Sequence, residues 1–119
     1  NHMGSKATED LRTMSIVLNE LKKRNLFFLD SLVSPKTICS NLAAKLHVGF
    51  AKRDIFLDNK EEAEYIKGQI YKLKRKAQMY GRAIGIGHDR KITLEVLKET
   101  MPELEREGYK FVFVSELVK

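Results

Sequence analysis

The sequence predicts an α/β fold built from helix–strand pairs around a parallel sheet. Three apolar runs each end on a polar side chain, at Asp30, Asp58 and His88. These end points are 28 and 30 residues apart, and each interval holds one amphipathic helical pattern. Such alternation is typical of strand–helix units in a parallel sheet. We therefore expect four helix–strand pairs, beginning with a helix.

The same three side chains are predicted to meet at one edge of the sheet. In parallel sheets, functional groups gather outside the carboxyl ends of the strands. Taken alone, His88 is either a loop residue whose ring hydrogen-bonds a carbonyl, or a proton donor or metal ligand, since the unperturbed pKa of histidine is about 6.5. Two strand-ending carboxylates favour the second interpretation, because they could orient the imidazole or hold a metal.

The first helix is expected to begin at an N-cap, Thr8, and to end where Asn25 takes a left-handed conformation. Its inward stripe is predicted at Leu11, Met14, Val17, Leu18 and Leu21. The second helix is expected to open with Ser34 as cap and Pro35 in the first helical position, and to end near His47. Its inward stripe is predicted at Ile38, Leu42 and Leu46.

A strand, or an extended entry followed by a short strand, is expected over residues 50–58. Charged residues inside such a run are usually paired, so Arg53 and Asp54 predict an ion pair at the sheet edge. The third helix should be capped by Asp58 or Asn59 and end at Tyr80-Gly81. Its inward stripe is predicted at Ala63, Ile66, Ile70, Leu73 and Ala77.

The last helix contains a proline, Pro102, which should kink or restart it. The stripe predicted to face inward is Leu94, Leu97, Met101 and Leu104. Residues 109–114 are expected to form the fourth strand.

Composition narrows the class of protein. The chain has 119 residues and a net charge of +6, from 22 basic and 16 acidic residues. The densest basic run lies late in a helix that starts with acidic residues, which suits the helix dipole and favours a solvated face over a nucleic-acid site. No apolar run is long enough to span a membrane. Cys39 is the single cysteine and is expected to be a small buried residue.

Five stretches resemble, in order and spacing, the divergent polysaccharide deacetylase family over essentially the whole chain. They are residues 1–5 (Asn-His-Met-Gly-Ser), 28–31 (Phe-Leu-Asp-Ser), 53–59 (Arg-Asp-Ile-Phe-Leu-Asp-Asn), 86–88 (Ile-Gly-His) and 102–105 (Pro-Glu-Leu-Glu). The resemblance implies residues 1–119 as a single partial domain, the C-terminal part of a (β/α)7-type deacetylase barrel. That barrel's opening strand, with its Asp-Asp pair, is not among these stretches.

The family is similar to metal-dependent carbohydrate esterases, in which a divalent metal, usually zinc, polarises an acetyl carbonyl and activates a water. By this resemblance His2 would be a metal ligand and His88 the acid that protonates the leaving group. Asp30 and Asp58 would orient His88 or shape the pocket, with Arg53 and Asp54 as a supporting charge pair.

The resemblance therefore implies a hydrolase acting on acetylated cell-envelope polysaccharide, located in the periplasm or outside the cell, and inactive as this piece alone. The single histidine at residue 2, where related esterases have a pair, implies weak metal binding. The alternative is a non-catalytic module that binds carbohydrate or protein. An open sheet edge would favour a homo-oligomer.

Overall fold

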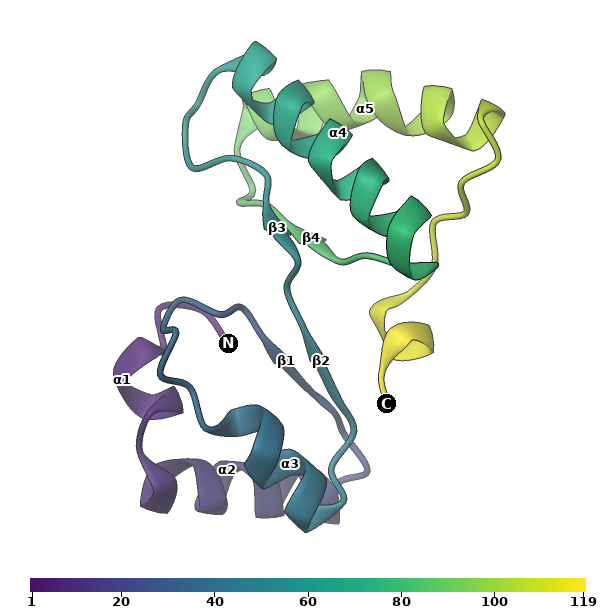
Figure 1. Cartoon of the computed structure of the whole chain (residues 1–119). Coiled ribbons are helices and arrows are strands. Elements are labelled where there is room, and N and C mark those ends of the chain that lie inside the picture. Colours follow the sequence, from purple (N-terminus) through teal and green to yellow (C-terminus); the bar gives the residue numbers. More distant parts are fainter. The chain divides into compact units, whose positions relative to one another are not determined.

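The computed structural model describes residues 1–119, which form two compact units (Figure 1). The first unit comprises residues 1–53 and 114–119, and the second comprises residues 54–113. Helices and short parallel strands alternate along the chain, so the predicted α/β class is confirmed. The (β/α)7 barrel and the single partial domain remain predictions. None of the helices combines the length and apolarity that crossing a membrane demands.

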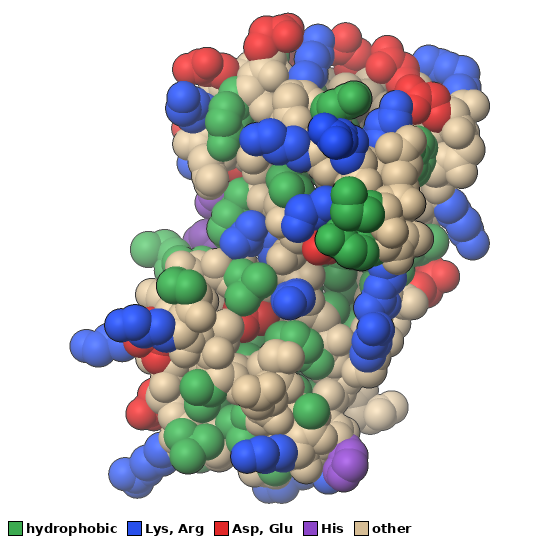
Figure 2. All heavy atoms as spheres, viewed as in Figure 1, with side chains coloured by type: hydrophobic (Ala, Val, Ile, Leu, Met, Phe, Trp, Pro, Cys, Tyr) green, Lys and Arg blue, Asp and Glu red, His purple; other side chains and the backbone are tan.

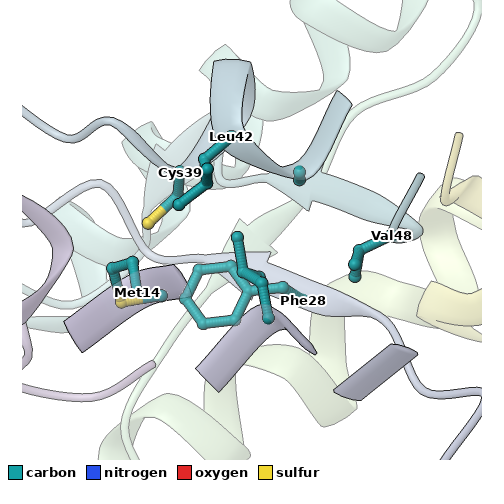
Figure 3. Packing of buried hydrophobic residues seen from close by; sticks show 7 residues of the cluster. Met14, Phe28, Cys39, Leu42 and Val48 are labelled. Carbon is teal, nitrogen blue, oxygen red and sulfur yellow. The ribbon is translucent and has the colours of Figure 1, made fainter. Parts of the chain in front are cut away.

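The first unit pairs β1 with β2 in parallel and packs helices against them. Its elements are α1 (Ser5–Thr8), α2 (Leu11–Lys23), β1 (Phe28–Asp30), α3 (Cys39–Leu46), β2 (Phe50–Lys52) and the 3-10 helix η1 (Val114–Leu117). The strand register sets Phe28 beside Phe50 and Asp30 beside Lys52. The core lies between α2, α3 and β1 (Figure 3), and its buried members are Met14, Leu18, Phe28, Cys39, Leu42, Ala43 and Val48.

The boundaries of α2 differ from the prediction at one end and agree at the other. Asp10, not Thr8, is the N-cap: its carboxylate accepts the backbone N–H of Thr13 at 2.8 Å. Thr8 is instead buried at the end of α1. Asn25 has φ 55°, so the left-handed ending is confirmed. Within the predicted stripe, Leu11 is 62% exposed and Val17 37%, so those two positions were wrong.

The helix predicted from Ser34-Pro35 begins later, at Cys39. The Ser34 hydroxyl does not cap a helix there, because it donates to Glu9 and accepts the N–H of Lys36 in a turn. The predicted end is close: His47 closes α3 in a left-handed conformation, with φ 56°. Tertiary contacts at Ser34 have therefore overridden the local Ser-Pro signal.

The second unit pairs β3 with β4 in parallel beside two longer helices. Its elements are β3 (Ile55–Phe56), α4 (Ala63–Tyr80), β4 (Gly85–Ile86) and α5 (Lys91–Arg106). Figure 1 shows α4 and α5 packed together on one side of the strand pair. Their shared core is Leu57, Ile66, Ile70 and Val96. In the space-filling view the Lys and Arg side chains are scattered among other residues on each unit (Figure 2).

Several local predictions in this unit need correction. Glu62, not Asp58 or Asn59, is the N-cap of α4, and it makes no capping bond through its side chain. The predicted end of that helix is confirmed, because Gly81 has φ 79°. In α5, Leu97 and Leu104 pack against the core as predicted, whereas Leu94 is 54% exposed, so that part of the stripe was wrong.

The fourth strand, predicted at residues 109–114, is absent. Residues 109–113 have no regular structure, and Val114 begins η1. The alternating apolar pattern becomes a strand only where a neighbour completes its backbone hydrogen bonds. In the second unit, β3 and β4 pair with each other and not with this segment. The predicted count of four helix–strand pairs was therefore wrong, whereas the first three strand positions agree with the structure.

Candidate active site

Asp58 and His88 meet at the carboxyl ends of β3 and β4. Asp58 follows β3 by two residues and is fully buried, whereas the His88 side chain, two residues beyond β4, is 37% exposed. Asp58 Oδ1 lies 2.8 Å from Nδ1 of the His88 ring, and Asp58 Oδ2 accepts the backbone N–H of His88 at 2.7 Å. One carboxylate thus holds the histidine through both its backbone and its ring.

Thr93, the third residue of α5, completes this arrangement. Its hydroxyl donates to Asp58 Oδ2 at 2.6 Å, and its side chain is buried. Gly87 lets the groups approach, because a Cβ there would lie 3.0 Å from the Thr93 methyl carbon and 3.5 Å from Asp58 Oδ2. The Gly-His sequence therefore reflects close packing as well as a strand end.

Arg90 supports the backbone of the same segment. Its guanidinium donates to the carbonyl of Asp58 at 2.7 Å and lies 3.4 Å from a carboxylate oxygen of Glu61. Both the side chain and the main chain of Asp58 are therefore held by residues at the start of α5. A fixed backbone allows the carboxylate to keep its direction toward the ring.

The environment of Asp58 favours its ionised form. Burial acts to raise the pKa of Asp58, but the hydrogen bonds donated by Thr93 and His88, together with the charge of the imidazole, act the other way, and the net pKa lies below the ordinary aspartate value. An ionised carboxylate can only accept hydrogen bonds. The Nδ1 atom of His88 therefore carries a proton and donates it to Asp58.

This pair has the chemistry of a general acid or base. The carboxylate holds the ring of His88 through Nδ1, and the ring is partly exposed to solvent. A histidine oriented by a buried carboxylate recurs in enzymes that move protons to and from a substrate.

Asp30 occupies the corresponding position in the first unit, at the end of β1, and is 1% exposed. Its carboxylate accepts the hydroxyl of Thr37 at 2.7 Å and the backbone N–H of Leu32 at 2.9 Å. Its carbonyl accepts the backbone N–H of Arg53 at 2.9 Å. Asp30 thus holds the loop after β1. That it joins Asp58 and His88 at one rim stays a prediction.

Arg53 and Asp54 both bind main-chain groups. The guanidinium of Arg53 donates to the carbonyl of Ser31 at 2.6 Å and to that of Leu32 at 3.0 Å. The Asp54 carboxylate accepts the backbone N–H of Ile84 at 2.8 Å. Each charged side chain therefore secures an irregular segment within its own unit, a role that the sequence did not reveal. The predicted ion pair between them stays a prediction.

The start of the chain lies against the end of β1. The side-chain oxygen of Asn1 accepts the backbone N–H of Ser31 at 2.8 Å. The backbone nitrogen of Asn1 donates to the carbonyl of Leu29 at 2.8 Å. The Ser31 hydroxyl is buried without a hydrogen-bond partner. His2, next to Asn1, is exposed. Asn1 therefore connects the start of the chain to the strand end that carries Asp30.

The described side chains do not form a metal site by themselves. A structural or catalytic divalent metal takes three or more protein ligands from residues such as His, Cys, Asp and Glu. No group of three such side chains gathers in either unit. His2 supplies one donor of the kind that zinc takes.

Sequence reasoning missed the residues that complete the Asp58 cluster. Thr93 was missed because the predicted inward stripe of α5 contains only apolar residues. One signal was present: Thr93 lies between Ile92 and Val96 on the helix face that is buried. A polar residue on a buried face indicates a hydrogen-bond partner.

Comparisons with known proteins give consistent results. The family model described as divergent polysaccharide deacetylase matches residues 1–118. An uncharacterized protein of Haemophilus influenzae and the uncharacterized protein YibQ of Escherichia coli are each 36% identical to this chain over 104 residues, which is 87% of the chain. Those 104 residues cover 37% of the first protein and 33% of the second, so this chain corresponds to about a third of their length.

A solved structure shows the same fold. The crystal structure of the uncharacterized protein ATU2773 from Agrobacterium tumefaciens matches with a TM-score of 0.96 and 24% identity. The match covers 98% of this chain and 48% of that protein. At this identity the likeness concerns the fold alone.

Proposed function

This chain belongs to the divergent polysaccharide deacetylase family, and from that premise we propose that it contributes an acid–base histidine to a hydrolase that deacetylates a cell-envelope polysaccharide. The observation that carries the proposal is the buried Asp58 carboxylate bonded to the ring of His88 at 2.8 Å. Family membership supports the carbohydrate substrate, and the pair supplies proton transfer.

Deacetylation breaks the bond between an acetyl carbon and an amine nitrogen or alcohol oxygen, and water supplies the new oxygen of acetate. The departing nitrogen or oxygen needs a proton to become a stable product. As an imidazolium, His88 can give the proton on Nε2 while Asp58 retains the hydrogen bond to Nδ1. General acid assistance of this kind contributes about 100-fold to 10,000-fold to a rate.

The proposed hydrolase also needs a metal ion. Family resemblance makes His2 a proposed ligand of a divalent ion, with zinc the first choice, which would polarise the acetyl carbonyl. Because His2 lies in no group of three ligands, residues 1–119 alone are expected to bind zinc weakly and to show no hydrolysis. The whole protein is proposed to act in the periplasm or outside the cell.

A non-catalytic carbohydrate- or protein-binding module is the second candidate. The observation that favours it is the single histidine at position 2, where the related esterases are expected to have a pair. The Asp58–His88 pair would then be a structural hydrogen bond at a binding surface.

Acetate release separates the two functions. The intact protein that contains this chain is incubated with acetylated polysaccharides, with and without zinc, and acetate and bound zinc are measured. Zinc-dependent acetate release that His88→Gln abolishes would support the hydrolase. Polysaccharide binding without acetate release or zinc uptake would leave the binding module.

A further inference from the structure

We infer that Thr93 is a positioning residue that holds the ring of His88 in one tautomer, with the proton on Nδ1 and the lone pair on Nε2. This inference rests on the proposed proton-transfer role of His88 and specifies which ring nitrogen performs it.

The two oxygens of the Asp58 carboxylate have different partners. Oδ2 accepts two hydrogen bonds, from the Thr93 hydroxyl at 2.6 Å and from the backbone N–H of His88 at 2.7 Å. Oδ1 accepts from the His88 ring at 2.8 Å. The two donors on Oδ2 fix the plane of the carboxylate, and this leaves Oδ1 directed at Nδ1.

Packing prevents the carboxylate from choosing another arrangement. Asp58 and Thr93 are 0% and 1% exposed, so no bulk water competes for Oδ2. The methyl group of Thr93 lies close to Gly87, where an added Cβ would be 3.0 Å from it. The Thr93 methyl therefore lies beside Gly87 while its hydroxyl donates to Asp58.

The consequence is a defined polarity for the imidazole. A free neutral imidazole favours the tautomer with the proton on Nε2. In that tautomer Nδ1, which faces Asp58, would carry no proton, and Nε2 would be a donor. The bond to an ionised carboxylate reverses that preference, because Nδ1 must donate. Nε2 then accepts a proton from solution and delivers it to a leaving group, which is the cycle that a general acid requires.

The test is direct observation of the His88 tautomer by NMR. The 119-residue chain is labelled with 15N-histidine, and long-range proton–nitrogen spectra, which distinguish a protonated ring nitrogen from a bare one, are recorded where the ring is neutral. The chain has three histidines, so the His88 signals are assigned by their loss in His88→Gln. Thr93→Val removes the hydroxyl and keeps the branched shape, and Thr93→Ser restores the hydroxyl.

A matched control lies on the same helix. Thr100 donates its hydroxyl to the carbonyl of Val96 at 2.8 Å and is not one of the donors to Asp58. Thr100→Val therefore removes a hydroxyl from the same helix without touching the Asp58 hydrogen bonds. Wild type, T93S and T100V are expected to show a single tautomer protonated at Nδ1. T93V is expected to lose it and show both tautomers.

Three outcomes would overturn the inference: a wild-type ring protonated at Nε2, a T93V ring that keeps the wild-type tautomer, or a T93S ring that does not. If T93V does not fold, Thr93→Ala removes the same hydroxyl without adding a buried methyl and is expected to give the same mixture. If the intact protein releases acetate, T93V should lower kcat by about 10-fold with KM unchanged. Correct tautomers without acetate release would leave Thr93's role standing and remove the hydrolase.

Discussion

The hydroxyl of Thr37 donates to the buried carboxylate of Asp30 at 2.7 Å and at the same time accepts the backbone N–H of Cys39 at 3.2 Å. One side chain therefore connects the end of β1 to the first turn of α3. The same principle operates in the second unit, where Thr93 joins Asp58 to the first turn of α5. In each unit a threonine ties a strand-ending aspartate to a following helix.

Replacing Thr37 with Val should destabilise the chain by about 1–3 kcal/mol, because Asp30 loses a donor and the N–H of Cys39 loses its acceptor. Urea unfolding at neutral pH measures the change. T37S keeps the hydroxyl and should recover most of the loss. Equal stabilities for T37V and wild type would show that the bond contributes nothing.

Acid should weaken the fold through Asp58. Because the pKa of Asp58 is lowered in the folded state, its ionised form contributes stability that is present above the unfolded pKa of about 3.9 and is lost as the pH falls through the folded value. Asp58→Asn removes this titration and places an amide among donors, which should cost about 2–4 kcal/mol at neutral pH.

The measurement is the free energy of unfolding of wild type and D58N from pH 7 downward. The difference in the free energy of unfolding between wild type and D58N should narrow below about pH 4, as the wild-type carboxylate becomes protonated. A gap that stays constant across this range would contradict the assigned role of the carboxylate.

Gly87→Ala should destabilise the second unit by about 1–3 kcal/mol, since the new methyl would approach the Thr93 methyl carbon to 3.0 Å. The control is Gly68→Ala in the middle of α4, where an added Cβ meets nothing within 4 Å. That change should stabilise by about 0.5–1 kcal/mol through helix propensity. Opposite signs in thermal unfolding test both positions, and a neutral G87A would argue against close packing there.

Two leucines of α2 test which face of that helix is buried. Leu18 is fully buried, whereas Leu11 is 62% exposed. Leu18→Ala should cost about 2–5 kcal/mol, and Leu11→Ala should change stability by at most about 0.5 kcal/mol. Similar losses for both variants in urea unfolding would restore the broader stripe that the sequence predicted.

The sequence predicted best those features that depend on backbone geometry and period. The ends of α2 and α4 follow from Asn25 and Gly81, which tolerate a left-handed backbone. The three short apolar runs that end at Asp30, Asp58 and His88 contain the strands β1, β3 and β4. The approach of His88 to Asp58 follows from parallel strands ending on the same side.

Features decided by competition between side chains were not predictable from local sequence. Thr8, Ser34 and Asp58 all look like helix caps, yet each bonds or packs elsewhere in the folded chain. A side chain caps a helix only where its oxygen lies within hydrogen-bond distance of the free N–H groups of the first turn. Tertiary contacts decide which side chain does so. The segment with alternating apolar residues after residue 108 likewise forms a strand only if a neighbouring strand pairs with it.

The double use of Asp58 has a dynamic consequence. The carboxylate that aligns the imidazole also anchors the opening turn of α5, so brief fraying of that turn would free Thr93 and release the ring together with it. The alignment of the His88 ring and the folding of the first turn of α5 would then be lost and regained together. Amide hydrogen exchange at residues 88 and 93 should accordingly follow a shared opening rate, which makes the beginning of a helix a reporter on the chemistry beside it.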